Sequence, residues 1–97
     1  MVKDIKNKKV TILGYGSTGQ AAAKLAYHLG AKIFISEKKS IKNKNSFLNK
    51  ISFEENGHSK KSYDCDIAIV SPGINTDNDF FRKFEKNSIP LLSEIEF

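Results

Sequence analysis

The chain has 97 residues, of which 39% are hydrophobic and 28% are charged, so we expect one small globular domain rather than a disordered segment. Sixteen Lys and Arg residues against 11 Asp and Glu give a net charge of +5, but the basic residues are spread along the chain, which favours a solvated surface over a nucleic-acid site. The longest apolar run, Ile67–Val70, is far shorter than the roughly 20 residues of a membrane span, and the single cysteine, Cys65, excludes an internal disulfide.

The first third of the chain has the pattern of a βαβ unit. Lys9–Leu13 is rich in β-branched and apolar residues and predicts a strand that stops at Gly14. Gln20–Leu29 carries apolar residues at helical spacing and is followed by Gly30, a common residue just past a helix end. Ala31–Ser36 predicts a second strand, which a right-handed crossover would place parallel to the first.

The alternation of strands and helices continues to the end of the chain. Ile51–Phe53 predicts a short third strand and Asp66–Val70 a buried fourth strand. Asp77–Asn87 predicts a helix with Asp77 or Asn78 as its cap, and Ile89–Leu92 a last short strand. We therefore expect an α/β fold, a Rossmann-like domain of three layers with four or five mostly parallel strands. The expected core of its second helix is formed by Phe80, Phe81 and Phe84.

The glycines between the first strand and the first helix form a G-x-G-x-x-G pattern. Gly14 would permit the tight turn, Gly16 the close approach of a ligand phosphate, and Gly19 the packing of the helix on the sheet. Free N–H groups near Ser17, Thr18 and Gly19 can bind a phosphate with help from the helix dipole. Ser17 or Thr18 could instead serve only as the helix N-cap.

Two further segments are expected at the same edge of the sheet as the glycine loop. Glu37 ends the second strand, where an acid accepts hydrogen bonds from ribose hydroxyls in dinucleotide-binding folds. It could equally accept one from the imide N–H of a uracil, or be a solvated surface residue, and Lys38 beside it could hold a phosphate. Ser71, Pro72 and Gly73 follow the fourth strand, so three separate segments are expected to converge on one crevice.

Three stretches of the chain resemble the N-terminal domain of the Mur ligase family, and within it the enzymes that add D-glutamate. They are the opening strand and glycine loop, the strand with its Ser-Pro-Gly-Ile turn, and the C-terminal stretch, at Val10–Gly19, Ile67–Ile74 and Ile89–Phe97. The chain departs from the family pattern at Glu37, where Asp is usual, and at Ser93, where Gly is common.

The resemblance implies that residues 1–97 form the UDP-binding domain of a ligase that adds D-glutamate to UDP-N-acetylmuramoyl-L-alanine in peptidoglycan synthesis. It implies that the loop backbone at Ser17 and Thr18 contacts the diphosphate. Glu37 and Lys38 would flank the uracil, and the turn after the fourth strand would line the opposite wall. The complete set of substrate-binding residues predicted in this way is Gly14, Gly16, Ser17, Thr18, Gly19, Glu37, Lys38, Ser71, Pro72 and Gly73.

The chain lacks the sequence that the ligase chemistry requires. Activation of a carboxylate by ATP and Mg²⁺ needs a phosphate-binding loop that ends in Gly-Lys, and no Gly-Lys pair occurs here. We therefore expect a truncated chain that binds substrate without catalysing, with no catalytic residue, cofactor or metal of its own. The resemblance assigns ATP and Mg²⁺ to a missing central domain and D-glutamate to a missing C-terminal domain. The absence of a secretory signal favours a cytoplasmic location.

Two other functions remain open from the residues alone. An NAD-binding regulatory or dehydrogenase domain would explain the glycine loop and Glu37, but not the two later stretches. A nucleic-acid or protein interaction module would explain only the lysines. No role is predicted for His28, His58 or Cys65, and His58 is expected in a polar loop without a partner.

Overall fold

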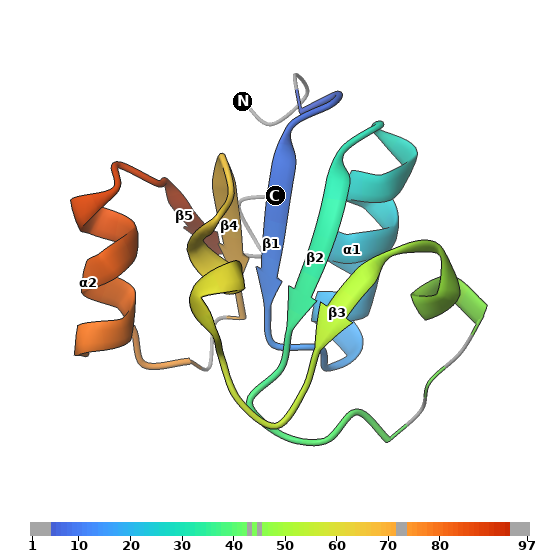
Figure 1. The fold of residues 1–97 in the computed structure, drawn as a ribbon. Helices are drawn as coiled ribbons and strands as arrows, with labels where there is room; N and C mark the ends of the chain where they lie inside the picture. The colour runs from blue at the N-terminus through green and yellow to red at the C-terminus, as the bar shows by residue number, and fades with distance from the viewer. Residues whose placement is uncertain (1–4, 43, 45, 72–73, 94–97) are drawn as a thin grey trace.

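The computed structural model describes residues 5–42, 44, 46–71 and 74–93. Within these ranges the chain alternates strands and helices, as expected (Figure 1). Two short 3₁₀ helices lie on either side of β3, at Ser46–Lys50 and Lys60–Tyr63. The strands and α-helices, in chain order, are β1 (Lys9–Leu13), α1 (Ser17–His28), β2 (Lys32–Ser36), β3 (Ser52–Glu54), β4 (Ile67–Val70), α2 (Asp79–Lys86) and β5 (Leu91–Ser93).

The five strands form one sheet in the order β3-β2-β1-β4-β5, with every neighbouring pair parallel. The strand order reverses beside β1, because β2 pairs with one edge of β1 and β4 with the other. The register places Leu13 beside both Ser36 and Val70. The carboxyl ends of β1, β2 and β4 are therefore level, at the position where open α/β sheets bind ligands.

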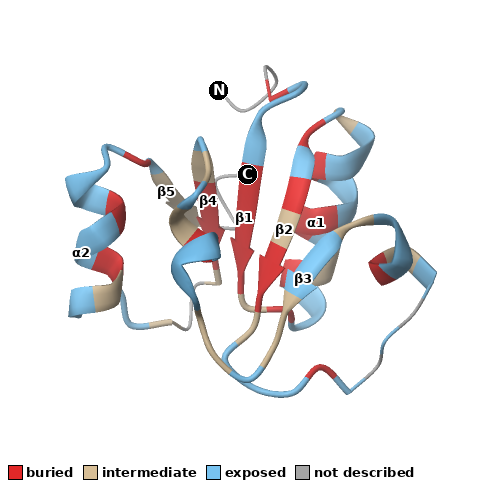
Figure 2. Ribbon diagram, in the orientation of Figure 1, coloured by how far each residue is buried: buried red, intermediate tan, exposed pale blue. Residues whose placement is uncertain are grey.

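One α-helix packs on each side of the sheet, and alternate residues of a strand point to opposite sides. Val10 and Ile12 belong to a core that includes alanines of α1, which let the helix pack close to the sheet. Leu13 belongs to a second core with Phe81 and Phe84 of α2. Figure 2 shows the buried residues concentrated in β1, β2 and β4, between the helices. The three-layer α/β prediction is thus confirmed, with five strands that are all parallel.

Several elements begin or end away from their predicted positions for identifiable reasons. The first helix begins at Ser17 rather than Gln20, because the loop itself forms the first turn and Gly16 is the N-cap. Asn78 caps α2 by accepting a hydrogen bond from the Phe81 N–H at 3.1 Å, which decides between the two predicted caps. The last strand begins at Leu91 because Pro90 has no N–H to donate to a strand pairing.

Candidate functional site

Gly14 is required by the fold itself. Its φ is +96°, a conformation that side-chain-bearing residues rarely adopt. A Cβ at this position would lie 3.1 Å from Cδ1 of Ile74 and 3.6 Å from Cβ of Ser71. The glycine loop therefore packs directly against the segment that follows β4, so two of the three predicted segments are in contact.

Gly16 has a different role, because neither its backbone nor its surroundings call for a glycine. Its φ of −80° and ψ of −168° are accessible to any residue, and no described atom lies within 4 Å of where a Cβ would be. Gly16 caps α1 without a side-chain hydrogen bond, so the alternative in which Ser17 or Thr18 caps the helix is wrong. The first turn of α1 is thus left open to a ligand.

Glu37 joins the glycine loop to the end of β2. Its Oε1 accepts a hydrogen bond from the Tyr15 N–H at 2.7 Å, and its Oε2 accepts one from the Lys39 N–H at 2.9 Å. The carboxylate is half-buried and held by two backbone groups, so it is fixed in place rather than free in solvent. Each oxygen retains a further lone pair, which leaves the group able to accept a hydrogen bond from a ligand.

A crevice of about 1070 Å³ lies at the carboxyl ends of the strands, beside the beginning of α2. Figure 1 shows both α-helices beginning at this edge of the sheet. Ser17 and Thr18 are exposed at the start of α1, Gly19 is buried in the helix packing, and none of the three is among the crevice residues. Pro72 and Gly73 lie outside the described residues. The predicted site residues that line the crevice are Gly14, Gly16, Glu37, Lys38 and Ser71.

His58 also lines this crevice, and the expectation that it lacks a partner is wrong. Its Nδ1 lies 2.6 Å from Oγ of Ser36, and its ring stacks on Phe80 with 4.8 Å between ring centroids and 16° between planes. Burial lowers the pKa of His58, and the nearby carboxylates of Glu54 and Glu37 only partly oppose this. A usable signal was present in the sequence, since His58 follows a parallel strand whose carboxyl end belongs to the same edge.

Glu54 completes a hydrogen-bonded group with Ser36 and His58, at the carboxyl ends of β2 and β3. Its Oε2 accepts hydrogen bonds from Oγ of Ser36 at 2.6 Å and from the Ser59 N–H at 2.9 Å. Burial by itself would raise the pKa of Glu54, but the hydrogen bonds from Ser36 and Ser59 outweigh it and hold the pKa below its ordinary value. Glu54 is therefore ionised near neutral pH.

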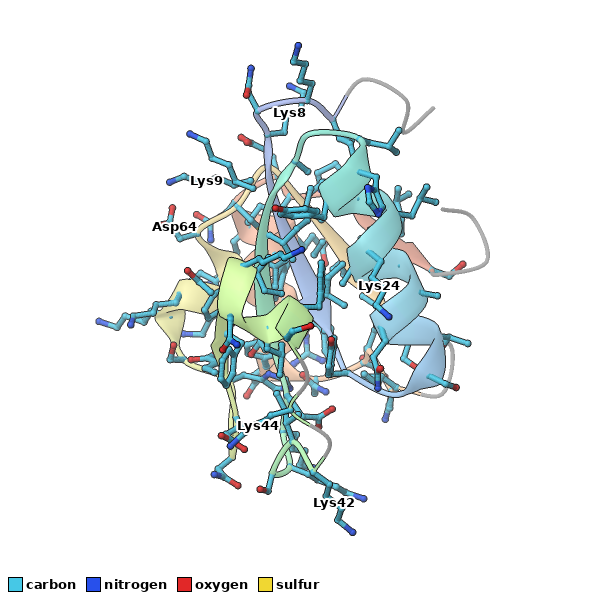
Figure 3. All side chains as sticks on the ribbon, turned by 90° about the vertical axis from the view of Figure 1, so that its right-hand side faces the viewer. Lys8, Lys9, Lys24, Lys42, Lys44 and Asp64 are labelled. Carbon is cyan, nitrogen blue, oxygen red and sulfur yellow. The ribbon has the colours of Figure 1, made fainter. Side chains whose placement is uncertain are left out.

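The positions of the labelled lysines, the possible metal ligands and the described helices bear on the other functional classes. Figure 3 shows Lys8 and Lys9 at one end of the molecule and Lys42 and Lys44 at the other, with Lys24 on α1 between them. These five lysines are dispersed and do not themselves form the basic stripe that is typical of nucleic-acid binding. Within the described ranges no group of three or more His, Cys, Asp or Glu side chains is placed to hold a metal ion. No α-helix in those ranges has the length and apolar character needed to cross a membrane.

The family comparison agrees with this geometry. Residues 9–80, which contain both the glycine loop and the strand before Ser71, match the family described as the MurD N-terminal domain. The chain belongs to the MurD N-terminal domain family. The resemblance to the Mur ligase family is thereby confirmed.

Curated relatives of this MurD N-terminal domain carry the name UDP-N-acetylmuramoylalanine--D-glutamate ligase. The protein from Thermosipho africanus is 39% identical over 92 residues, and that from Chlorobium chlorochromatii is 41% identical over 96 residues. These alignments cover 92% and 96% of this chain but only 22% and 21% of the two relatives. The chain thus spans about a fifth of the length of the ligases it matches.

Solved structures support the same fold class. UDP-N-acetylmuramate-alanine ligase MurC from Thermotoga maritima superposes with a TM-score of 0.68 at 23% identity, over 93% of this chain and 21% of that one. Shikimate dehydrogenase from Aquifex aeolicus superposes with a TM-score of 0.57 at 15% identity, over 98% of this chain and 45% of that one. At these identities the likeness concerns the fold alone, which is Rossmann-like.

Proposed function

We propose that this MurD N-terminal domain binds the UDP part of UDP-N-acetylmuramoyl-L-alanine in the crevice at the carboxyl ends of β1, β2 and β4. The observation that carries the proposal is Gly16, a glycine that the fold does not need, at the open start of α1. A glycine is needed at such a position when a ligand must approach the backbone. The names of the relatives supply the substrate class.

We assign different residues of the site to the diphosphate and to the nucleoside of the ligand. The N–H groups at the start of α1, near Ser17 and Thr18, bind the diphosphate, and the helix dipole favours the negative charge there. Glu37 faces the uracil or ribose with its remaining lone pairs, and the exposed Lys38 flanks the uracil or neutralises a phosphate oxygen. Ser71 lines the crevice beyond the end of β4, and the family resemblance assigns substrate contacts to Pro72 and Gly73 as well.

In the complete ligase this domain positions substrate for chemistry performed elsewhere. A ligase of this class uses ATP and Mg²⁺ to activate a carboxylate, and the residues of this chain do not fit that role because they include no Gly-Lys phosphate loop. We assign ATP and Mg²⁺ to a central domain, D-glutamate to a C-terminal domain, and the whole activity to the cytoplasm. The contribution of this chain is to bind and orient the nucleotide end of the substrate, without catalysis of its own.

A ligand titration followed by NMR tests the proposal. Because the other domains would supply further contacts, we expect UDP and UDP-N-acetylmuramoyl-L-alanine to bind this chain with a Kd of roughly 10 μM to 1 mM. Amide shifts should concentrate at Gly16, Thr18 and Lys38. The discriminating control is NAD, since a glycine loop followed by an acid also suits a dinucleotide. Shifts at these residues with NAD and none with UDP would replace the proposed function by the dinucleotide one.

The variant Gly16→Val tests the phosphate position within the same titration. The added side chain enters open space, so the domain should fold, but it blocks the approach of a phosphate and should weaken UDP binding by more than about tenfold. Ala21→Val is the matched control, because Ala21 is exposed on α1 outside the crevice lining. Unchanged UDP affinity in a folded Gly16→Val domain would place the phosphate elsewhere.

A further inference from the structure

The imidazole of His58 is held in the crevice wall by two contacts that leave one ring nitrogen unused. Its Nδ1 is taken by Ser36 Oγ at 2.6 Å, and its face is covered by the ring of Phe80. Within the described residues Nε2 has no hydrogen-bond partner. These two contacts fix the position and the plane of the ring. Nε2 remains available for a hydrogen bond with a ligand.

The hydrogen bonds around Ser36 determine which ring nitrogen carries the proton. The Ser36 hydroxyl has a single hydrogen and lies 2.6 Å from both Oε2 of Glu54 and Nδ1 of His58. Glu54 is ionised and can only accept, so Ser36 donates to Glu54. The Ser36 oxygen must then accept from His58, which places the proton on Nδ1. A neutral His58 therefore has a lone pair on Nε2 and acts as an acceptor there.

The surroundings of His58 indicate which part of a ligand it would meet. It shares the crevice with Glu37 and Lys38 at the end of β2, where related folds place the nucleoside, whereas the glycine loop takes the phosphates. Both oxygens of Glu37 already accept backbone N–H groups. By contrast, Nε2 of His58 accepts no hydrogen bond from the described residues, so its lone pair is available to a ligand in the crevice.

We propose that His58 is a specificity-determining residue whose Nε2 accepts a hydrogen bond from the nucleoside of the bound ligand, either from the imide N–H of uracil or from a ribose hydroxyl. This inference rests on the proposed function, because it requires UDP in the crevice. It adds a residue from the segment after β3 to the three segments that the sequence brings together.

A mutant cycle with ligand analogues tests this assignment in the whole 97-residue chain. His58→Phe keeps an aromatic ring for Phe80 but removes the acceptor, and should weaken UDP binding about three- to tenfold, the effect of one lost hydrogen bond. His58→Gln, with an amide oxygen near the position of Nε2, should recover part of the affinity. The control His28→Ala removes an exposed histidine at the end of α1 and should leave binding unchanged.

Two analogues of UDP identify the group that donates to His58. They also distinguish ligand recognition by His58 from a purely structural role. 3-Methyl-UDP lacks the imide N–H, and 2′-deoxy-UDP lacks one ribose hydroxyl. The analogue that has lost the bonded group should bind the native chain more weakly than UDP, yet bind His58→Phe as well as UDP does. A purely structural role for His58 would weaken all three ligands equally and would overturn the proposal.

A measurement on the native chain keeps the test valid if His58→Phe fails to fold. The ¹⁵N resonances of the ring should show Nδ1 protonated and Nε2 bare, with Nε2 shifting when UDP is added. A proton on Nε2 in the free chain, or an Nε2 resonance that UDP does not move, contradicts the assignment. If UDP binds and His58 does not respond, only this inference fails. If UDP does not bind at all, the proposed function fails and this inference fails with it.

Discussion

Gly14 and Gly16, in the loop after β1, differ in whether the fold requires a glycine at that position. Gly14 has a φ of +96° and lies against Ile74, so both backbone and packing exclude a side chain. Gly16 has an ordinary backbone conformation and open space where a Cβ would be. The first glycine therefore serves the fold, and the second is free to serve a ligand.

This difference predicts opposite results for the same substitution at the two positions. Gly14→Ala should lower the free energy of unfolding by about 1–2 kcal/mol, since an L-residue is strained at positive φ. Gly16→Ala should change it by less than about 0.5 kcal/mol, because a weaker N-cap is offset by the lower entropy of the unfolded chain. Urea denaturation of the two variants measures both values. Equal losses at the two positions would show that Gly16 is also needed by the fold.

At the scale of elements, the beginning of α2 is fixed by the side chain of its N-cap, Asn78. The helix has eight residues, too few to be stable alone, and is held by its cap and by the burial of Phe81 and Phe84. Asn78 accepts the Phe81 N–H and also donates from its side chain to the Asn75 carbonyl at 3.1 Å. The cap thus fixes the end of α2 that borders the crevice.

We expect Asn78→Ala to lower the free energy of unfolding by about 1 kcal/mol, the usual cost of removing an N-cap. Asp77→Ala is the matched control. Asp77 is exposed and pairs with Arg82 at 3.4 Å, and such a surface pair contributes at most about 1 kcal/mol and commonly nothing measurable. Urea denaturation compares the free energies of unfolding of the two variants. A larger loss for Asp77→Ala would contradict the assignment of Asn78 as the N-cap.

At the scale of the whole molecule, one hydrogen-bonded group connects β2, β3 and the segment before the second 3₁₀ helix. Ser36 and Glu54 lie in the two strands, and His58 follows β3. Burial lowers the pKa of His58 below 6.5, whereas hydrogen bonds lower that of Glu54 below 4.5. Both groups therefore bind protons more readily in the unfolded chain than in the folded one.

This arrangement predicts that the domain loses stability on acidification. In the unfolded chain His58 takes up a proton as the pH falls through 6.5, while in the folded chain it stays neutral until a lower pH, so the free energy of unfolding falls across that interval. Glu54 adds a second loss as the pH falls below 4.5. Urea denaturation at a series of pH values measures the effect. His58→Phe should remove the first loss and keep the second, and an unaltered profile in this variant would contradict the assignment.

The sequence by itself determined the α/β class, the parallel order of the first two strands and the three segments at the crevice. These follow from local patterns: apolar runs of strand length, helical spacing of alanine and leucine, and glycines at a strand end. The resemblance carried by Val10–Gly19 and Ile67–Ile74 determined the family, because the order and spacing of those motifs are specific.

Only the tertiary structure decided the roles of Gly16, Glu37 and His58. Whether a glycine serves the fold or a ligand depends on the space around its missing Cβ, and whether a carboxylate is solvated depends on which backbone N–H groups reach it. The partners of His58 come from β2 and α2, 22 residues away in each direction. No local pattern specifies such pairs, since they arise when strand register and helix packing bring distant residues to one edge.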